Sequence, residues 1–262
     1  MVNLLWSGVV ITRTENGTMT KELYHDQKFA EIYNDHLVSL WDFRAEELTL
    51  IDHELKIYTT VSRSDFEQFM NRQNEEQIQR ELQSFDEERL RLTRNATLAV
   101  YNRIKPQTFV ADTLLICGYQ TFEYHILNHE VMNQKIWISP SLQARINLEV
   151  NNAAMKKIEK IFKDNRERYF TALGIELDPI TIAVEQIENA GYIMKRTDYG
   201  LREKADPEHD QRVESSINEI SAISEWKIDP AIFTYHTRYQ ELDFNSYQIA
   251  QIKKAEKQLL PD

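Results

Sequence analysis

The sequence SDFEQFMNRQNEEQIQRELQSFDEERLRLTRNATLAVYNRIKP, residues 64–106, is the stretch that most strongly constrains the fold. It opens with Ser64 and Glu67, whose Ser-x-x-Glu spacing is that of a capping box at a helix N-terminus. No glycine or proline interrupts it until Pro106, which cannot continue a helix. The stretch therefore predicts one long amphipathic helix.

The apolar residues of this helix predict a surface for contact with another helix. From Ile78 their spacing alternates between four and three, as in a coiled-coil seam, with a break at Arg89. A continuous helix of about 40 residues would be ~60 Å long, roughly twice the diameter of a small domain. Unless it bends or breaks near residues 71–74, it must project or meet another subunit. Leu82 and Phe85, inside the seam, are candidate interaction residues.

The residues before the helix predict a small β-rich unit. Asn16-Gly17, with apolar residues on both sides, is a strong hairpin signal because both central positions of a type I′ turn need positive φ. Asp26 is placed to cap a short helix whose apolar residues, from Phe29 to Trp41, recur at helical spacing. Residues 47–61 alternate with period two and predict two more strands. We therefore expect an antiparallel ββαββ unit over residues 1–62.

A second long helix is predicted after a mixed segment at residues 106–140. In that segment Thr113–Cys117 is expected to be a buried strand. Ser139-Pro140 supplies a cap and a first-turn proline, and Gly174 stands where a helix commonly ends. The two long helices are expected to pack antiparallel, so that residues 63–174 form a helical hairpin with the mixed segment as its tip.

The C-terminal part, residues 175–262, is predicted to be mainly helical. Three Asp-Pro pairs, at 178–179, 206–207 and 229–230, are suited to starting helices, although the residues after the third are also β-prone. The predicted fold class is therefore α+β: a small antiparallel N-terminal unit, then long coiled-coil-like helices, then a mostly helical part.

Composition restricts the possible classes of protein. The 262 residues include 42% hydrophobic and 28% charged residues, which is typical of a globular protein and not of a disordered one. One cysteine cannot form an intrachain disulfide, and we found no signal-peptide pattern and no apolar run of about 20 residues. We therefore expect a cytoplasmic or intracellular protein without a membrane segment, with a virion component as an alternative. The net charge of −11 argues against general nucleic-acid binding.

Residues 112–130 contain four candidate metal ligands, and His53 is a further candidate for the third position of such a site. If residues 125–129 are helical, His125 and His129 share a face and can bind one zinc ion, with Glu123 or Asp112 contributing. Asp112 and Glu123 alternatively resemble the paired carboxylates of a manganese- or magnesium-dependent nuclease. The competing interpretation is two ordinary surface or partly buried histidines, so the primary expectation is no cofactor, with zinc or manganese as the alternative.

Two further features predict contacts with proteins. A basic stretch at residues 155–168 includes Lys156, Lys160 and Lys163, which are placed to contact an acidic partner or a second copy of the chain. Trp226, expected at the end of a polar helix, is a candidate interface anchor.

The function favoured by the sequence is that of a non-catalytic structural, assembly or protein-interaction component of a larger complex, with a viral or mobile-element origin left open. The chain lacks Gly-rich phosphate-binding loops and a nucleophile elbow, which favours a protein that is not an enzyme. The alternative is a metal-dependent hydrolase or nuclease that uses the four residues named above. A third hypothesis is an acidic mimic of nucleic acid.

Overall fold

A single sheet of twelve strands dominates the computed structural model, which describes residues 7–15, 17–128, 131–201 and 212–259. The strand order is β12-β6-β5-β4-β3-β2-β1-β11-β10-β9-β8-β7, and all neighbours are antiparallel except β12 and β6. The strands are β1 (Ser7–Glu15), β2 (Thr18–His25), β3 (Lys28–Tyr33), β4 (His36–Asp42), β5 (Glu47–Asp52), β6 (Ile57–Ser62), β7 (Pro106–Ile116), β8 (Tyr119–Asn128), β9 (Val131–Ser139), β10 (Tyr192–Leu201), β11 (Arg212–Lys227) and β12 (Gln240–Glu241).

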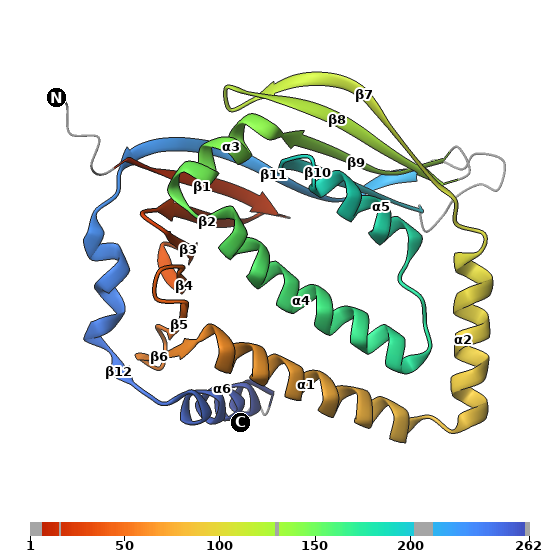
Figure 1. Ribbon diagram of the computed structural model, residues 1–262, viewed down its shortest axis with the longest axis horizontal. Coiled ribbons are helices and arrows are strands. Elements are labelled where there is room, and N and C mark those ends of the chain that lie inside the picture. The colour runs from red at the N-terminus through yellow and green to blue at the C-terminus, as the bar shows by residue number, and fades with distance from the viewer. Residues whose placement is uncertain (1–6, 16, 129–130, 202–211, 260–262) are drawn as a thin grey trace.

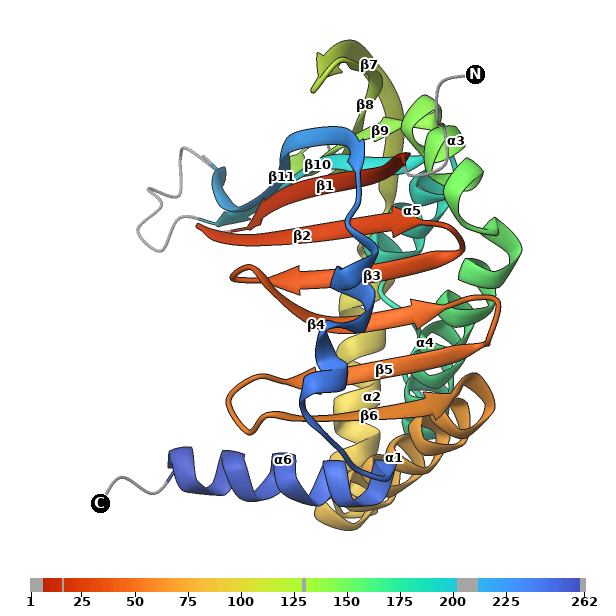
Figure 2. The same cartoon turned by 90° about the vertical axis from the view of Figure 1, so that its left-hand side faces the viewer.

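Helices cover both faces of the sheet unequally. In Figure 1 the sheet bends over α1, α3, α4 and α5, which lie inside the bend, while α2 stands at the far end. The short helix η1 crosses the opposite face of the sheet (Figure 2). The helices are α1 (Arg63–Ser84), α2 (Glu87–Tyr101), α3 (Pro140–Glu149), α4 (Asn152–Leu173), α5 (Pro179–Glu188), the 3₁₀ helix η1 (Pro230–Arg238) and α6 (Phe244–Leu259).

The predicted fold class is wrong, because the sheet runs through all three parts into which the sequence was divided. The expected tip at residues 106–140 supplies β7, β8 and β9, and the expected helical part at residues 175–262 supplies β10, β11 and β12. The N-terminal strands are therefore half of a larger sheet. The described residues contain no long coiled coil.

The expected helix at residues 26–42 is a hairpin of β3 and β4. Asp26 is the first residue of a two-residue turn, and both Asp26 and Gln27 have positive φ. Asn34 and Asp35 form a second turn of the same kind between β3 and β4. Asn and Asp tolerate positive φ and so favour these turns, and the apolar residues of two short strands joined by such turns happen also to recur at helical spacing. The hairpin predicted at Asn16-Gly17 is confirmed on the described residues, since Glu15 pairs with Thr18 and Gly17 has positive φ, while Asn16 itself lies outside them.

The long helix predicted from residue 64 is two helices. Ser62, not Ser64, caps α1, and its Oγ accepts from the Asp65 amide at 3.1 Å. Phe85 is extended, and Asp86 caps α2 by accepting from the Arg89 amide at 2.7 Å. The break therefore falls beside Phe85, outside the region 71–74 where it was anticipated.

The second predicted long helix is also divided, between α3 and α4. Val150 is extended, and Asn151 caps α4 because its Oδ1 accepts from the Ala153 amide at 2.9 Å. Gly174 ends α4 in the left-handed conformation, as predicted.

The expected antiparallel packing of the two long helices is wrong. Phe66, near the start of α1, meets Phe162 of α4, with ring centroids 6.0 Å apart. Farther along both helices, Asn74 Nδ2 donates to the Asn165 carbonyl at 2.8 Å. Residue numbers increase together in the two helices, so α1 and α4 run in the same direction.

The C-terminal predictions had mixed outcomes. Asp178-Pro179 starts α5 as expected, with Asp178 Oδ1 accepting from the Ile180 amide at 3.0 Å. Asp229-Pro230 starts η1. The Asp206-Pro207 pair lies outside the described residues, but the helix expected to follow it is the long strand β11. Among the described residues, no helix is both long enough and apolar enough to cross a membrane.

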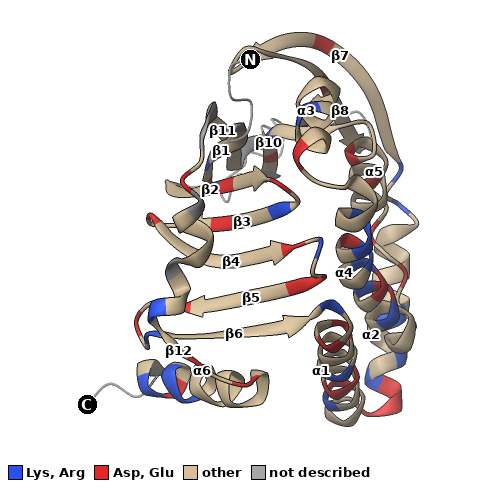
Figure 3. Cartoon of the chain, turned by 60° about the vertical axis from the view of Figure 1, so that its left-hand side comes forward, with Lys and Arg blue, Asp and Glu red and all other residues tan. Residues whose placement is uncertain are grey.

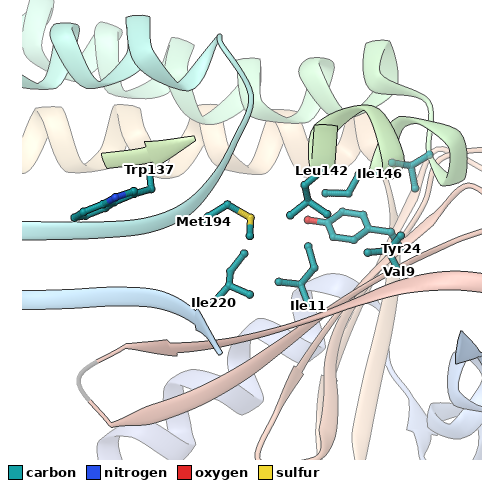
Figure 4. Close-up of a cluster of buried hydrophobic side chains, with 9 residues drawn as sticks. Val9, Ile11, Tyr24, Trp137, Leu142, Ile146, Met194 and Ile220 are labelled. Carbon is teal, nitrogen blue, oxygen red and sulfur yellow. The ribbon is translucent and has the colours of Figure 1, made fainter. Parts of the chain in front are cut away.

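The central apolar cluster joins α3 to the middle of the sheet. Figure 4 shows Leu142 and Ile146 of α3 facing Val9, Ile11 and Tyr24, with Met194, Ile220 and Trp137 beside them. Leu142, Ile146, Val9 and Ile11 have no exposed surface. Because α3 contributes an apolar face to strands from both halves of the chain, it helps to hold the sheet together as one body.

A buried polar network lies at the end of this cluster. Arg13 Nε of β1 is 3.4 Å from Glu22 Oε1 of β2, and both side chains are mostly buried. The hydroxyls of Tyr24 and Tyr192 both donate to Glu22 Oε2. Arg13 also donates to Asn218 Oδ1 at 2.7 Å. The network therefore ties β1 and β2 to β10 and β11.

Candidate interaction surface

The two edges of the sheet differ in whether other parts of the chain cover them. At the β6 edge, β12 adds a short parallel strand. The amides of Gln240 and Leu242 donate to backbone carbonyls just before and within β6, at 3.0 and 2.9 Å. Helix α6 lies along the same edge (Figure 2). Asp52 Oδ2 anchors it by accepting from Gln251 Nε2 at 3.0 Å and Lys254 Nζ at 2.8 Å. This edge is therefore covered.

The β7 edge is open. Strand β7 pairs with β8 from Pro106 to Ile116, and no strand of the described residues pairs with its other side. All nine residues from 107 to 115 are exposed, on both faces of the strand. Four of them are large and apolar: Phe109, Val110, Leu114 and Leu115, with exposed fractions of 45%, 53%, 52% and 69%. The Thr113–Cys117 segment, expected to be a buried strand, is thus largely exposed.

The open edge is held in place by the rest of the sheet. The turn after β7 has positive φ at Cys117 and Gly118, the geometry that a two-residue hairpin requires. Cys117 Sγ lies 3.8 Å from the Ile220 carbonyl, so the tip rests on β11. Thr121 Oγ1 donates to the Leu114 carbonyl at 2.8 Å. The strand is therefore presented in a fixed position.

Charge is sparse along β7. Figure 3 shows one acidic segment on the strand, and Asp112 is its only charged residue. Its Oδ1 accepts from the Thr113 amide at 2.7 Å. A bulge between Val110 and Asp112 divides the edge into two short segments with different side-chain directions. Charged residues, bulges and prolines usually protect an exposed edge strand from pairing with other chains, and β7 has few of these features.

The predicted metal ligands are only partly brought together. Residues 119–128 form strand β8, so the helical i, i+4 argument for His125 and His129 is wrong, and His129 lies outside the described residues. Positions two apart share a face of a strand, and His125 Nε2 lies 2.6 Å from Glu123 Oε1. Lys135 Nζ is 3.7 Å from the same carboxylate oxygen.

Asp112 is opposite Glu123 in the β7–β8 register, but its carboxylate is bound to the neighbouring amide and exposed. No group of three or more His, Cys, Asp or Glu side chains in the described part of the chain is arranged to hold a metal ion. The metal-dependent hydrolase hypothesis is therefore left with a single His–Glu pair among the described residues.

The predicted interaction residues of the first long helix lie at its break. Leu82 and Phe85 are half-buried at the end of α1 and just beyond it. The Arg89 guanidinium lies 4.7 Å from the Phe85 ring centroid, so this ring is shielded by the chain itself. Trp226 belongs to β11, opposite Gly8, and not to a helix, and its side chain is outside the described part of the structure.

The basic stretch of α4 is largely neutralised within the chain. Lys160 Nζ is 2.5 Å from Asp164 Oδ2, and Lys163 Nζ is 3.2 Å from Glu185 Oε2 of α5. Lys156 is exposed on the same helix. Lysines that are already paired make this stretch a weaker docking surface than its sequence suggested.

Comparison with known proteins adds no assignment, because neither the family models nor the curated protein sequences gave a match. The candidate site therefore rests on geometry. Sequence reasoning missed it because β7 resembles a buried strand: its apolar residues and near absence of charge are what burial in a sheet also requires.

Proposed function

We propose that the protein is a non-catalytic interaction component of an intracellular complex, and that it binds an extended segment of a partner polypeptide as an additional strand on β7. The observation that carries this proposal is the run of nine exposed residues, 107–115, on an edge strand that no described strand pairs. An edge of this kind presents unpaired backbone N–H and C=O groups, which a partner strand satisfies.

The covered β6 edge supports the proposal. The same sheet places β12 and α6 over one edge and leaves the other open. Both edges face the same risk of uncontrolled pairing, and the protection of only one is expected if the other has a partner.

The energetics favour a partner that contacts more than the strand. Full burial of a large apolar side chain contributes about 1.5–3 kcal/mol, so completing the burial of the four half-exposed side chains contributes roughly 4 kcal/mol. Backbone hydrogen bonds add about 1 kcal/mol each. Association itself costs an estimated 4–15 kcal/mol, so strand addition alone gives modest affinity.

The proposal is tested by photo-crosslinking in the cells that produce the protein. A photoreactive amino acid at Leu115 should capture one defined polypeptide through a short segment. The control is the same group at Leu148 near the end of α3, which is 77% exposed and is not part of the open sheet edge. Leu148 should give no such product.

A second variant separates strand pairing from general stickiness. Val110→Lys with Thr113→Lys places two charges on the open edge and should abolish capture at Leu115, because lysine on an edge opposes strand addition. Capture that survives these charges, or equal capture at Leu148, would show that β7 is not the docking strand.

A further inference from the structure

The segment formed by η1 and β12, residues 230–241, lies as a strap across one face of the sheet and ends at the β6 edge (Figure 2). Phe233 anchors this strap, since its ring is buried in an apolar cluster with residues of β2, β3, β4 and β5. At the far end of the strap, β12 pairs with β6 through two residues, Gln240 and Glu241. The cover of the β6 edge therefore depends on how firmly the strap lies on the sheet.

In the described part of the chain, three histidines contact the strap or belong to it. His25 of β2 stacks on Phe233, with ring centroids 6.1 Å apart. His53, in the turn between β5 and β6, has its Nδ1 2.9 Å from the Tyr239 hydroxyl. His236 is the third, and it lies within η1. Because histidine changes charge near pH 6.5, each of the three is a candidate for linking the attachment of the strap to pH.

His25 and His53 can each accept a second proton and keep their polar partners. His25 Nδ1 lies 3.7 Å from Glu149 Oε2, so a charged His25 faces a carboxylate. His53 Nε2 lies 2.6 Å from a backbone carbonyl of β4, which only accepts, so Nε2 carries a hydrogen and Nδ1 accepts from the Tyr239 hydroxyl. After protonation, Nδ1 donates to the same oxygen. The His36 ring, 4.7 Å away, opposes charge on both stacked rings at once but not on His53 alone.

His236 differs because its charged form lacks an acceptor in the docked strap. The residue is 9% exposed, and its Nδ1 is buried without a hydrogen-bond partner among the described residues. The Tyr58 ring packs edge-on against the imidazole, with centroids 4.9 Å apart. A second proton makes both ring nitrogens donors, so Nδ1 becomes part of a charged group with an unpaired donor, which costs more than an unpaired neutral nitrogen.

The charged groups around His236 come from the strands beneath it and from β12. Lys28 of β3 repels a proton on the imidazole, although Asp42 of β4 lies 2.5 Å from the lysine ammonium. Glu241 of β12 attracts the proton, but its carboxylate also accepts from the Tyr58 hydroxyl at 3.1 Å. Burial has the largest effect, and with Lys28 it outweighs Glu241, so the net pKa of His236 is lowered. The released strap therefore binds the proton more tightly than the docked strap does.

We infer that the strap is an acid-released cover of the β6 edge: protonation of His236 favours the state in which residues 230–241 leave the sheet, and the loss of β12 opens β6 to an added strand. A released histidine has a pKa of about 6.5, and the docked one a lower pKa. The docked strap is therefore fully stable above about pH 6.5 and is weakened as the pH falls from there. The inference does not involve β7, and crosslinking at Leu115 tests the proposed function separately.

Amide hydrogen exchange in the full-length protein, followed by NMR at pH 7.5 and 5.5, tests the inference. The reporters are the amides of Gln240 and Leu242, which donate to the carbonyls of Lys56 and Tyr58. After correction for the intrinsic exchange rate at each pH, their protection should fall several-fold. The limit is about tenfold, because one proton is taken up and pH 5.5 is one unit below a pKa of about 6.5. Amides that join β1 to β2 should keep their protection.

Three variants assign the effect. His236→Phe keeps an aromatic ring against Tyr58 but takes up no proton, so its strap should be equally protected at both pH values. His236→Lys places a lasting charge in the same contact and should lower the protection of the strap already at pH 7.5. His25→Gln is the matched control, because it removes another histidine that contacts the strap, and it should retain the loss between pH 7.5 and 5.5.

Several results would overturn the inference. Unchanged protection of Gln240 and Leu242 between the two pH values would do so, as would a loss that extends through β1 and β2. So would a loss that survives in His236→Phe or disappears in His25→Gln, and a fully protected strap in His236→Lys. An imidazole resonance of His236 that titrates with a midpoint above about pH 6.5 would also contradict it.

Discussion

Removal of the Glu22 carboxylate should be among the most damaging single changes in the sheet. Glu22→Ala leaves the Arg13 guanidinium without the carboxylate 3.4 Å away, and it removes the acceptor of the Tyr24 and Tyr192 hydroxyls. The Arg13 and Glu22 side chains are only 14% and 21% exposed, so water replaces these contacts poorly.

The expected cost follows from this burial. Breaking a buried ion pair by removing one partner costs about 3–5 kcal/mol, because the remaining charge is uncompensated. Arg13 keeps its bond to Asn218 Oδ1, which places the expected loss near the lower limit, at about 3 kcal/mol. For a chain of this size that corresponds to a fall in Tm of roughly 6 °C.

The assay is urea unfolding followed by tryptophan fluorescence, with the m-value checked for two-state behaviour. The matched control is Arg44→Ala, which removes an ion pair with Asp26 in which both side chains are more than half exposed. Exposed pairs contribute about 0–1 kcal/mol, so this control should leave stability nearly unchanged. A loss below about 1 kcal/mol for Glu22→Ala would refute the structural role given to the network.

Three further predictions concern the supports of α2, of α6 and of the network. Gly174 has a φ of +65° and lies against Arg94, so Gly174→Ala should lower the free energy of unfolding by about 1–2 kcal/mol or more and speed amide hydrogen exchange in α2. Unchanged exchange in α2 would contradict the contact between Gly174 and Arg94. Burial raises the pKa of Asp52, but hydrogen bonds from a backbone amide and from Lys254 outweigh it and the net pKa is lowered. The contribution of Asp52 to the attachment of α6 should therefore be complete above the usual aspartate pKa of about 3.9 and be lost as pH falls through the lowered pKa. Amide hydrogen exchange in residues 244–259 would measure this loss. The Asp52→Ala variant should show no such pH dependence. Burial, and then the Glu22 charge, raise the pKa of Tyr192. The contribution of the Tyr192 hydroxyl to stability should therefore be present below about pH 10 and lost at higher pH. Tyrosinate absorbance that develops fully in the folded protein near pH 10 would contradict this prediction.

Local signals predicted turns and caps but not the sheet. The hairpin after Glu15, the helix start at Asp178-Pro179 and the helix end at Gly174 were predicted correctly because each depends on local backbone geometry. The break at Phe85 depends on Asp86 capping a new helix, and Asp86 was readable as a cap. The apolar pattern gave no sign of the break, because the spacing of apolar residues can continue from one helix into the next when both helices have the same spacing.

Pairing between distant segments could not be read from one sequence. Strand β1 pairs with β11, more than 200 residues away, and no local pattern encodes that contact. The candidate surface shows the same limit. The apolar residues of β7 predict a strand, but whether a strand lies at the centre or the edge of a sheet depends on the strands around it.

Amide hydrogen exchange along β7 tests the central claim most directly, measured on the free protein and on the complex with the polypeptide captured at Leu115. In the free protein, outward amides within residues 107–115 should exchange quickly, while those paired with β8 are protected. In the complex the outward amides should become protected as a strand is added. Uniform protection of β7 in the free protein, or no change on binding, would contradict strand addition on β7.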